Sequence, residues 1–162
     1  MKTEDKISRL KSICQQDAGI KFVEFDDAPS GVTPNEAWTH VIGVNSKPSI
    51  VFSLDDHDSD AQEVWWRLAR ANGLISEDGT CLLSVGGIGL LPWARVRLSE
   101  GVPVLSLFAF YKGSPEFVVR NEEGNRYLAV TSEEHGTWFY LVECQVGKLT
   151  TVMLPGGGSA EA

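Results

Sequence analysis

Residues 58–72 carry the sequence DSDAQEVWWRLARAN, which predicts the strongest helix of the chain. Asp58 or Ser59 can cap its first turn, because a side-chain oxygen there accepts hydrogen bonds from free backbone N–H groups. Asn72 followed by Gly73 is typical of a helix end. An apolar stripe at helical spacing is expected to face the core; it consists of Ala61, Val64, Trp65 and Leu68.

The two adjacent tryptophans of this helix cannot both lie on the centre of the apolar stripe. Trp66 is rotated by about 100° from Trp65 around the helix axis. We therefore expect one of them in the core, and the other either under a neighbouring loop or exposed as an anchor for a partner. Acidic residues precede the helix and occupy its first turns; they are Asp55, Asp56, Asp58, Asp60 and Glu63.

The pattern of the whole chain predicts an α+β fold. We expect a mostly antiparallel sheet of about seven to nine strands, with two helices, at residues 3–18 and 58–72, packed on it. A chain of 162 residues is one domain by size. We predict a single domain over residues 1–154 and a disordered Gly/Ser-rich tail over residues 155–162.

Several segments carry strand patterns. Residues 38–44 and 49–54 alternate like the two strands of a hairpin. Residues 103–112 are apolar on both faces, which is typical of a central strand covered on two sides. Residues 116–154 hold successive strands whose links are too short for parallel crossovers, so we expect them to pair as an antiparallel meander.

The chain is acidic, with a formal net charge of −8. Residues 1–80 contain 8 basic and 14 acidic side chains, and residues 81–162 contain 6 basic and 8 acidic side chains. This balance argues against a nucleic-acid-binding face, which needs clustered Lys and Arg, and against binding to an anionic membrane. It permits a basic protein partner, or a protein that imitates the charge of a nucleic acid.

The cysteines indicate a reducing compartment. Cys14, Cys81 and Cys144 are odd in number and far apart, so the sequence predicts neither a disulfide framework nor a zinc site. The first residues lack an apolar signal region, and no apolar run approaches the ~20 residues needed to span a bilayer. We therefore expect a cytoplasmic protein.

The acidic run contains part of a calcium-binding pattern. Asp56, Asp58 and Asp60 have the D-x-D-x-D spacing that begins an EF-hand loop. The rest of the motif fails, because Ala61 stands where the loop needs glycine and Arg67 where it needs glutamate. We therefore predict a helix cap and no metal site.

A glycine-rich turn follows the strand predicted at residues 81–85. It is not a phosphate-binding loop, because no lysine follows it at the required place. A flexible turn of this kind can nevertheless form the lip of a binding pocket. The residues of this alternative ligand pocket are His40, Gly86, Gly87, Gly89 and Trp93.

The candidate catalytic groups form no known pattern. Nucleophilic catalysis needs a histidine base and an orienting acid, and no signature such as G-x-S-x-G is present. Glu133 and Glu134 are adjacent carboxylates, but neighbouring strand residues point to opposite sides of a sheet and rarely share a substrate. We predict no catalytic residue and no cofactor, and we do not expect an enzyme.

These features favour a small acidic cytoplasmic protein-binding module of the inhibitor, immunity or chaperone type. Its partner is expected to have a basic surface, and the contact residues predicted from the sequence are Asp55, Asp56, Asp58, Asp60, Glu63 and Trp66. The first alternative is a small-ligand-binding or hydrolytic domain with its pocket at the glycine-rich turn. The second alternative is a nucleic-acid-mimic inhibitor.

Overall fold

The computed structural model describes residues 2–26, 30–43, 45–53, 58–111, 113–145 and 147–154. The side chains of residues 58, 59, 110 and 111 are outside this description. The helices are α1 (Thr3–Cys14), α2 (Pro34–Val41), α3 (Asp58–Ala71) and α4 (Val104–Leu107). The strands are β1 (Ile20–Asp26), β2 (Ile50–Ser53), β3 (Thr80–Val85), β4 (Trp93–Leu98), β5 (Ala109–Tyr111), β6 (Ser114–Pro115), β7 (Phe117–Arg120), β8 (Arg126–Glu133), β9 (Gly136–Gln145) and β10 (Lys148–Thr151).

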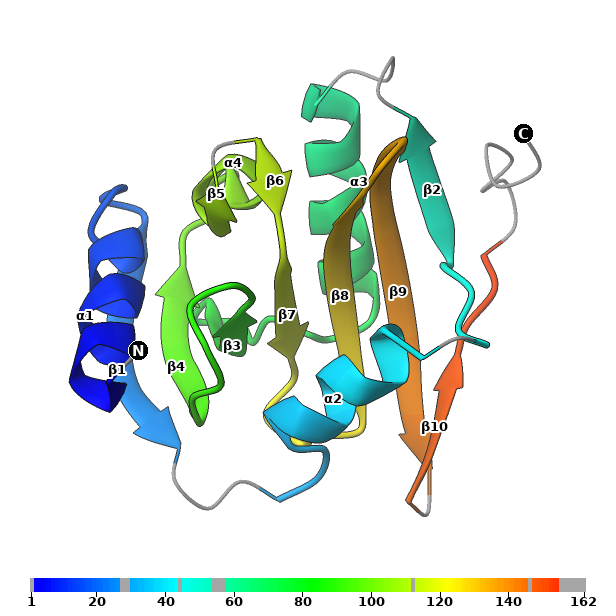
Figure 1. Ribbon diagram of the computed structural model, residues 1–162, viewed down its shortest axis with the longest axis horizontal. Coiled ribbons are helices and arrows are strands. Elements are labelled where there is room, and N and C mark those ends of the chain that lie inside the picture. Colours follow the sequence, from blue (N-terminus) through cyan, green and yellow to red (C-terminus); the bar gives the residue numbers. More distant parts are fainter. Residues whose placement is uncertain are drawn as a thin grey trace.

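One antiparallel sheet organises the molecule (Figure 1). Its eight strands follow the order β1-β4-β3-β7-β8-β9-β10, and β2 also pairs with β9. The short strands β5 and β6 form a separate two-stranded sheet. The α+β fold with an antiparallel sheet predicted from the sequence is therefore confirmed. None of the helices in the described ranges is both long and apolar enough to cross a membrane.

The long strand β9 is edged by two short strands. β2 pairs with residues 136–139 and β10 with residues 142–145, so the two occupy successive halves of the same edge. Ser49 bridges the break between them: its backbone N–H donates to the Phe139 carbonyl at 2.7 Å, and its hydroxyl accepts from the Leu141 N–H at 2.9 Å. This explains why a serine is buried at this position.

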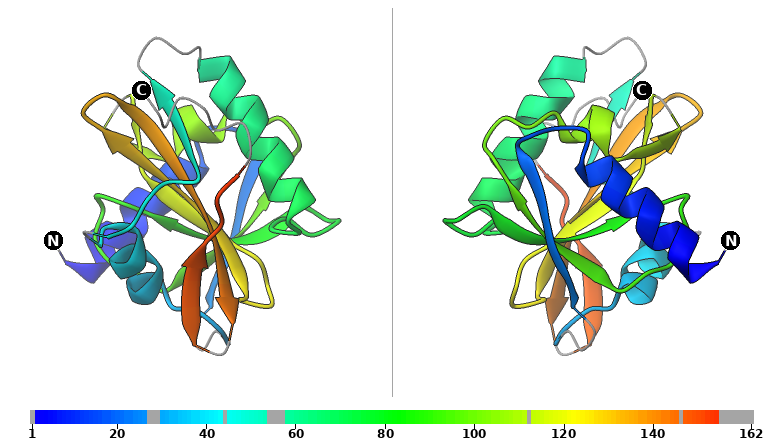
Figure 2. Two further views of the ribbon diagram at one scale, coloured as in Figure 1. Left: turned by 90° about the vertical axis from the view of Figure 1, so that its right-hand side faces the viewer. Right: turned by 90° about the vertical axis from the view of Figure 1, so that its left-hand side faces the viewer.

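The sheet separates two apolar cores. The larger core is built by α1, α3 and α4 with one face of the sheet. The smaller core lies on the other face, where Ala37 and Val41 of α2 cover Leu82, Val118 and Ala129. Figure 2 shows α2 and α3 on opposite sides of β8 and β9. The polar outer faces of both helices follow from this arrangement.

The predicted hairpin of residues 38–44 and 49–54 is wrong in its first strand, which is helical. Thr33 and Glu36 form a reciprocal capping box: each backbone N–H donates to the other side chain at 3.1 Å. Pro34 suits the first helical position because it needs no donor there. The alternation of apolar residues that suggested a strand was too short to distinguish the two-residue period of a strand from the 3.6-residue period of a helix.

The predicted central strand at residues 103–112 is also wrong, because only Ala109–Tyr111 forms a strand, β5, and this strand belongs to the separate two-stranded sheet. The first part of the segment forms the single turn α4, in which the Phe108 N–H donates to the Val104 carbonyl at 2.9 Å. Val104, Leu105 and Phe108 are buried in the larger core. The segment is apolar on both faces because a buried turn, rather than a strand, needs apolar residues all round. The first helix likewise ends at Cys14, four residues before its predicted end.

Candidate functional site

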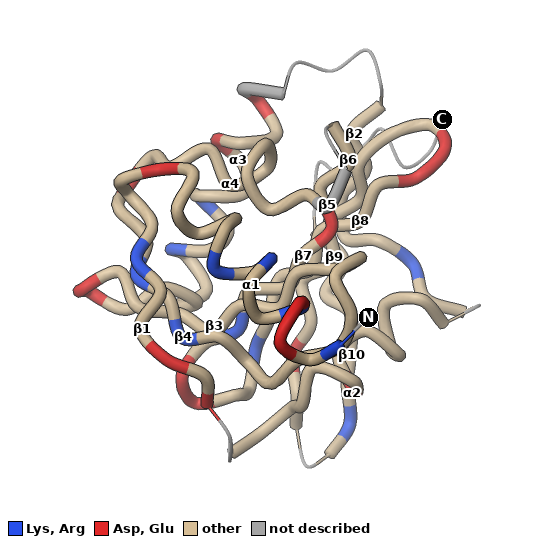
Figure 3. The backbone as a smooth tube through the Cα atoms, turned by 60° about the vertical axis from the view of Figure 1, so that its left-hand side comes forward, with Lys and Arg blue, Asp and Glu red and all other residues tan. Residues whose placement is uncertain are grey.

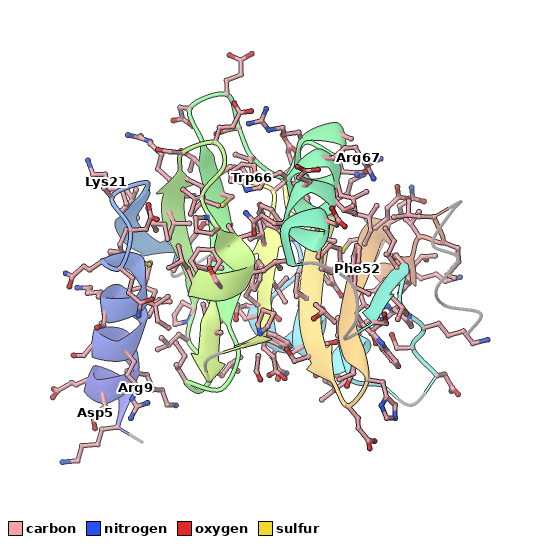
Figure 4. All side chains as sticks on the ribbon, turned by 90° about the horizontal axis from the view of Figure 1, so that it is seen from above. Asp5, Arg9, Lys21, Phe52, Trp66 and Arg67 are labelled. Carbon is pink, nitrogen blue, oxygen red and sulfur yellow. The ribbon has the colours of Figure 1, made fainter. Side chains whose placement is uncertain are left out.

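Trp66, the predicted anchor for a partner, is buried. It is 9 % exposed, and its indole N–H donates to the Val102 carbonyl at 3.0 Å. The Arg70 guanidinium lies 5.4 Å from the ring centroid. Figure 4 shows Trp66 on the side of α3 that faces the green strands and Arg67 on the other side. Trp65 is fully buried, so Trp66 lies under a neighbouring loop, and its role as an exposed anchor is wrong.

The acidic residues predicted to contact a partner are only partly described. Asp55 and Asp56 lie outside the described residues, and Asp58 begins α3 with its side chain outside the description. Asp60 and Glu63 are exposed on α3. In the described part of this surface, Trp66, which was expected to supply affinity for a partner, is therefore part of the core.

The predicted ligand pocket is split by the structure. Gly86, Gly87 and Gly89 line a hollow of about 390 Å³ between α2 and the ends of β3, β7 and β8. Trp93 is fully buried in the smaller core, where its indole N–H donates to a backbone carbonyl at 2.9 Å. His40 lines a separate hollow, and its Nε2 lies 3.0 Å from the Thr151 hydroxyl. The expectation that His40 and Trp93 share the glycine pocket is wrong. His40 lies on α2 and lines the other hollow, and Trp93 is buried beneath the surface.

The glycine hollow continues the face of the sheet that α2 covers. Side chains two residues apart on a strand share a face. Ser84, Glu116 and Thr131 therefore lie on the same face as the apolar residues beneath α2, and Glu133 follows Thr131 on that face. We call this region the acidic hollow; it is lined by Trp38, Ile42, Ser84, Leu90, Glu116 and Glu133, among other residues.

Backbone and indole hydrogen bonds hold the walls of the acidic hollow. The Trp38 indole N–H donates to the Ser84 hydroxyl at 2.9 Å, which fixes α2 to β3. The Gly86 N–H donates to the Glu116 carbonyl at 2.8 Å. A Cβ added at Gly86 would lie 3.1 Å from Glu116 Oε2 and 3.3 Å from Trp38 Cη2. Glycine at this position therefore keeps space open beside the carboxylate.

The two carboxylates of the acidic hollow lack a described counterion. Burial raises the pKa of Glu116, and the charge of Glu133 raises this pKa further. Among the described residues, which omit Lys112, no basic side chain lies within 4.0 Å of either carboxylate. The Lys6 side chain from α1 passes close to Gly89 but is not ion-paired with either carboxylate. The half-buried Glu116 carboxylate is thus only partly solvated, whereas Glu133 is exposed.

Apolar side chains surround these carboxylates. Ile42 is 73 % exposed and Leu90 is 53 % exposed, and both line the acidic hollow beside the half-buried Trp38. Single exposed apolar side chains are common on protein surfaces, but here two of them line the same hollow as a half-buried carboxylate. A negative centre with an apolar rim fits a cation carried on an aliphatic stem.

Other chemistry has less support in the described residues. They contain no group of three or more His, Cys, Asp or Glu side chains that could hold a metal ion. Cys14 and Cys81 are buried, and burial raises the pKa of the Cys14 thiol to about 11, which opposes formation of a reactive thiolate.

The comparisons with known proteins give no relative. No family model, no curated protein and no solved structure matches this chain. The functional argument therefore rests on the site itself.

Glu116 was missed in the sequence, although a signal for it is present. Glu116 and Val118 alternate on one strand, and Ala129, Thr131 and Glu133 alternate on the next. A hairpin that pairs Phe117 with Val130 brings both carboxylates to the same end of the sheet. Glu133 does belong to a pair of acids, but its partner is Glu116, not the adjacent residue.

Proposed function

We propose that this protein is a cytoplasmic binding module without enzymatic activity, and that it holds a partner protein by accepting a Lys or Arg side chain in the acidic hollow. The observation that carries the proposal is the half-buried Glu116 beside Glu133, with no described counterion, inside an apolar rim. The contact surface therefore moves away from α3, where Trp66 is buried.

Electrostatics favour a cationic occupant. A carboxylate that is partly desolvated and close to a like charge is stabilised when a cation enters. The aliphatic stem of Lys or Arg can cover Ile42 and Leu90 while its charged end reaches the carboxylates. The net charge of −8 would in addition steer a basic partner toward the protein and speed association at low salt.

Nuclear magnetic resonance can test this proposal with two defined probes, N-acetyl-lysine amide and N-acetyl-arginine amide. The indole N–H of Trp38 is a reporter inside the site, because it donates to Ser84. We expect both probes to shift this resonance and the amide resonances of Gly86 and Gly87, whereas the neutral N-acetyl-norleucine amide should not.

A matched pair of double variants separates the site from bulk charge. Glu116→Gln with Glu133→Gln should abolish the shifts of the Trp38 resonance. Asp60→Asn with Glu63→Gln removes the same two charges from the exposed surface of α3 and should leave the shifts intact. The proposal would be refuted if both double variants lost the shift of the Trp38 resonance equally, or if the neutral probe shifted this resonance as much as the charged probes do.

A second candidate is a small amine ligand in the same hollow. The volume of about 390 Å³ lies in the range of small-molecule sites, about 300–1,000 Å³. A thermal-shift screen with free diamines and polyamines distinguishes the two, since a ligand at 100 times its Kd adds ~2.7 kcal/mol of stability. Strong stabilisation by one such amine would favour the small ligand over a protein partner.

The nucleic-acid mimic receives less support from the arrangement of charges. In Figure 3 the acidic residues lie in short separate segments with basic residues between them. Three of the carboxylates are paired with Arg95 and are not presented as a free row.

A further inference from the structure

A second hollow, next to the acidic one, has the opposite charge. It has a volume of about 620 Å³ and lies between the end of α2, the residues that follow it, and β10. We call it the basic hollow; it contains Lys47 and Lys148 together with His40, Thr150 and Thr151. None of the described residues that line it is acidic, in a chain with 22 acidic and 14 basic side chains.

The lysines of the basic hollow are available for a ligand. In the described ranges, neither Lys47 nor Lys148 has a carboxylate within 4.0 Å. Both lysines are exposed. His40 lies close to the Thr151 hydroxyl, and burial lowers its pKa, so the lysines supply the positive charge. Their two full charges outweigh the partial charge of about −0.5 at the end of a helix such as α2.

The last turn of α2 separates the two hollows. Trp38 and Ile42 are four residues apart and line the acidic hollow. Thr39 and Gly43 are also four residues apart, are rotated by about 100° from the first pair, and line the basic hollow. Each hollow has one exposed apolar side chain next to the last turn of α2 or to β10. Ile42 lines the acidic hollow, and Met153, which is 62 % exposed, lines the basic hollow.

We propose that the two hollows together bind one extended segment of the partner protein, which carries a basic side chain, an apolar side chain and an acidic side chain in that spatial order. This inference rests on the proposed function of the acidic hollow. A helix with its side chains is about 10–12 Å wide, and an extended chain advances about 3.3–3.6 Å per residue. The basic and acidic residues of the segment are therefore about three to four positions apart.

Synthetic peptides test the charge order directly. The probes are SKSLSES and its reverse SESLSKS, with both termini blocked, because the direction of the bound segment is open. Controls replace either Lys or Glu by Gln. We expect one of the two orders to shift both the Trp38 indole resonance and the Gly43 amide resonance. Replacing its Glu by Gln should raise Kd about three- to fivefold, the effect of an exposed ion pair.

Charge reversal on the protein gives the decisive comparison. Lys47→Glu with Lys148→Glu should raise the Kd of the bound Lys–Glu peptide about tenfold or more and should improve binding of SKSLSKS, which carries a second Lys. Lys21→Glu with Arg67→Glu introduces the same charge change at two exposed residues that do not line the basic hollow and that lie far from each other in Figure 4. This control should alter Kd by less than about twofold at moderate salt.

The outcomes separate this inference from the proposed function. If the Glu of the peptide and the lysines of the protein have no effect while the Lys of the peptide still binds, the two-hollow inference fails and the acidic hollow stands. If no peptide shifts the Trp38 resonance, both fail. If inorganic phosphate alone occupies the basic hollow and does not compete with the peptide, that hollow is a small-anion site and the inference is overturned.

Discussion

Two regions of this sheet differ in whether their carboxylates are ion-paired. On β4 and its neighbours, one guanidinium, that of Arg95, lies 2.8 Å from Glu122, 2.9 Å from Glu24 and 3.3 Å from Asp26. In the acidic hollow, Glu116 and Glu133 have no described cation within ion-pair distance. An excess of acidic residues thus does not by itself mark a binding surface. The region that matters is the one where the described residues place no cation within ion-pair distance of the carboxylates.

A buried arginine strengthens the compensated region. Arg120 is 1 % exposed and donates to the backbone carbonyls of Val32, Asn121 and Glu122 at 3.0–3.1 Å. Its guanidinium lies 5.6 Å from the centroid of the Trp93 ring. These contacts tie the turn after β7 to the segment before α2, so the arginines of this region are structural.

The largest expected effect comes from Arg120→Met. This change removes three hydrogen bonds. The Val32 carbonyl keeps the Trp93 indole and the Asn121 carbonyl keeps the Gly124 N–H, whereas the Glu122 carbonyl loses its donor. Because the contact of the guanidinium with the Trp93 ring is lost as well, we expect a loss of about 3 kcal/mol in the free energy of unfolding. Urea denaturation measures the loss. Arg120→Lys keeps the charge but not the planar fork of donors, and should recover only part of it. A loss below about 1 kcal/mol would show that the arginine does not organise this region.

A smaller effect is expected for Arg95→Ala, which leaves three carboxylates close together. The Arg95 side chain is 22 % exposed and two of its partners are exposed, so we expect about 1–2 kcal/mol after allowing for solvent screening. Arg97→Ala is the matched control two residues along the same strand; its ion pair with Asp78 is 3.6 Å long and more exposed. If both variants lose the same stability, the Arg95 network has no special role.

The smallest effect is expected at Glu116, and it has the opposite sign. Because the folded state raises the pKa of Glu116, the wild-type protein loses stability as pH rises through that pKa. Glu116→Gln cannot ionise and should therefore be more stable than the wild type at pH 7, by less than about 1 kcal/mol. The difference should vanish below the ordinary glutamate pKa of about 4.3. Destabilisation at pH 7 would contradict an uncompensated charge.

The sequence predicts α3 well and α2 badly, and their lengths explain the difference. α3 spans residues 58–71, long enough for the 3.6-residue period to be clear. α2 has only 8 residues, and its alternating Trp38, His40 and Ile42 imitate a strand. The local signal that decides the case is the capping box of Thr33 and Glu36, which precedes the misleading pattern.

The candidate site was predicted only in part. The glycine turn does line a hollow, because such a turn follows the end of β3. The hollow also requires the position of α2, which covers the apolar part of the sheet and leaves Glu116 and Glu133 open. The burial of Trp66 depends on the Val102 carbonyl, 36 residues away in sequence. Sequence periodicity carries no information on such long-range coverage.

The hydroxyl of Ser49 has a consequence for the way in which this sheet can associate. It bonds to β9 at the break between two edge strands of four residues each, β2 and β10, so neither strand offers a long row of free backbone groups. Short, interrupted edges are poor templates for the addition of another chain and so limit aggregation by strand pairing. Recognition at this end of the molecule is accordingly expected through side chains on the face of the sheet, where the two hollows lie.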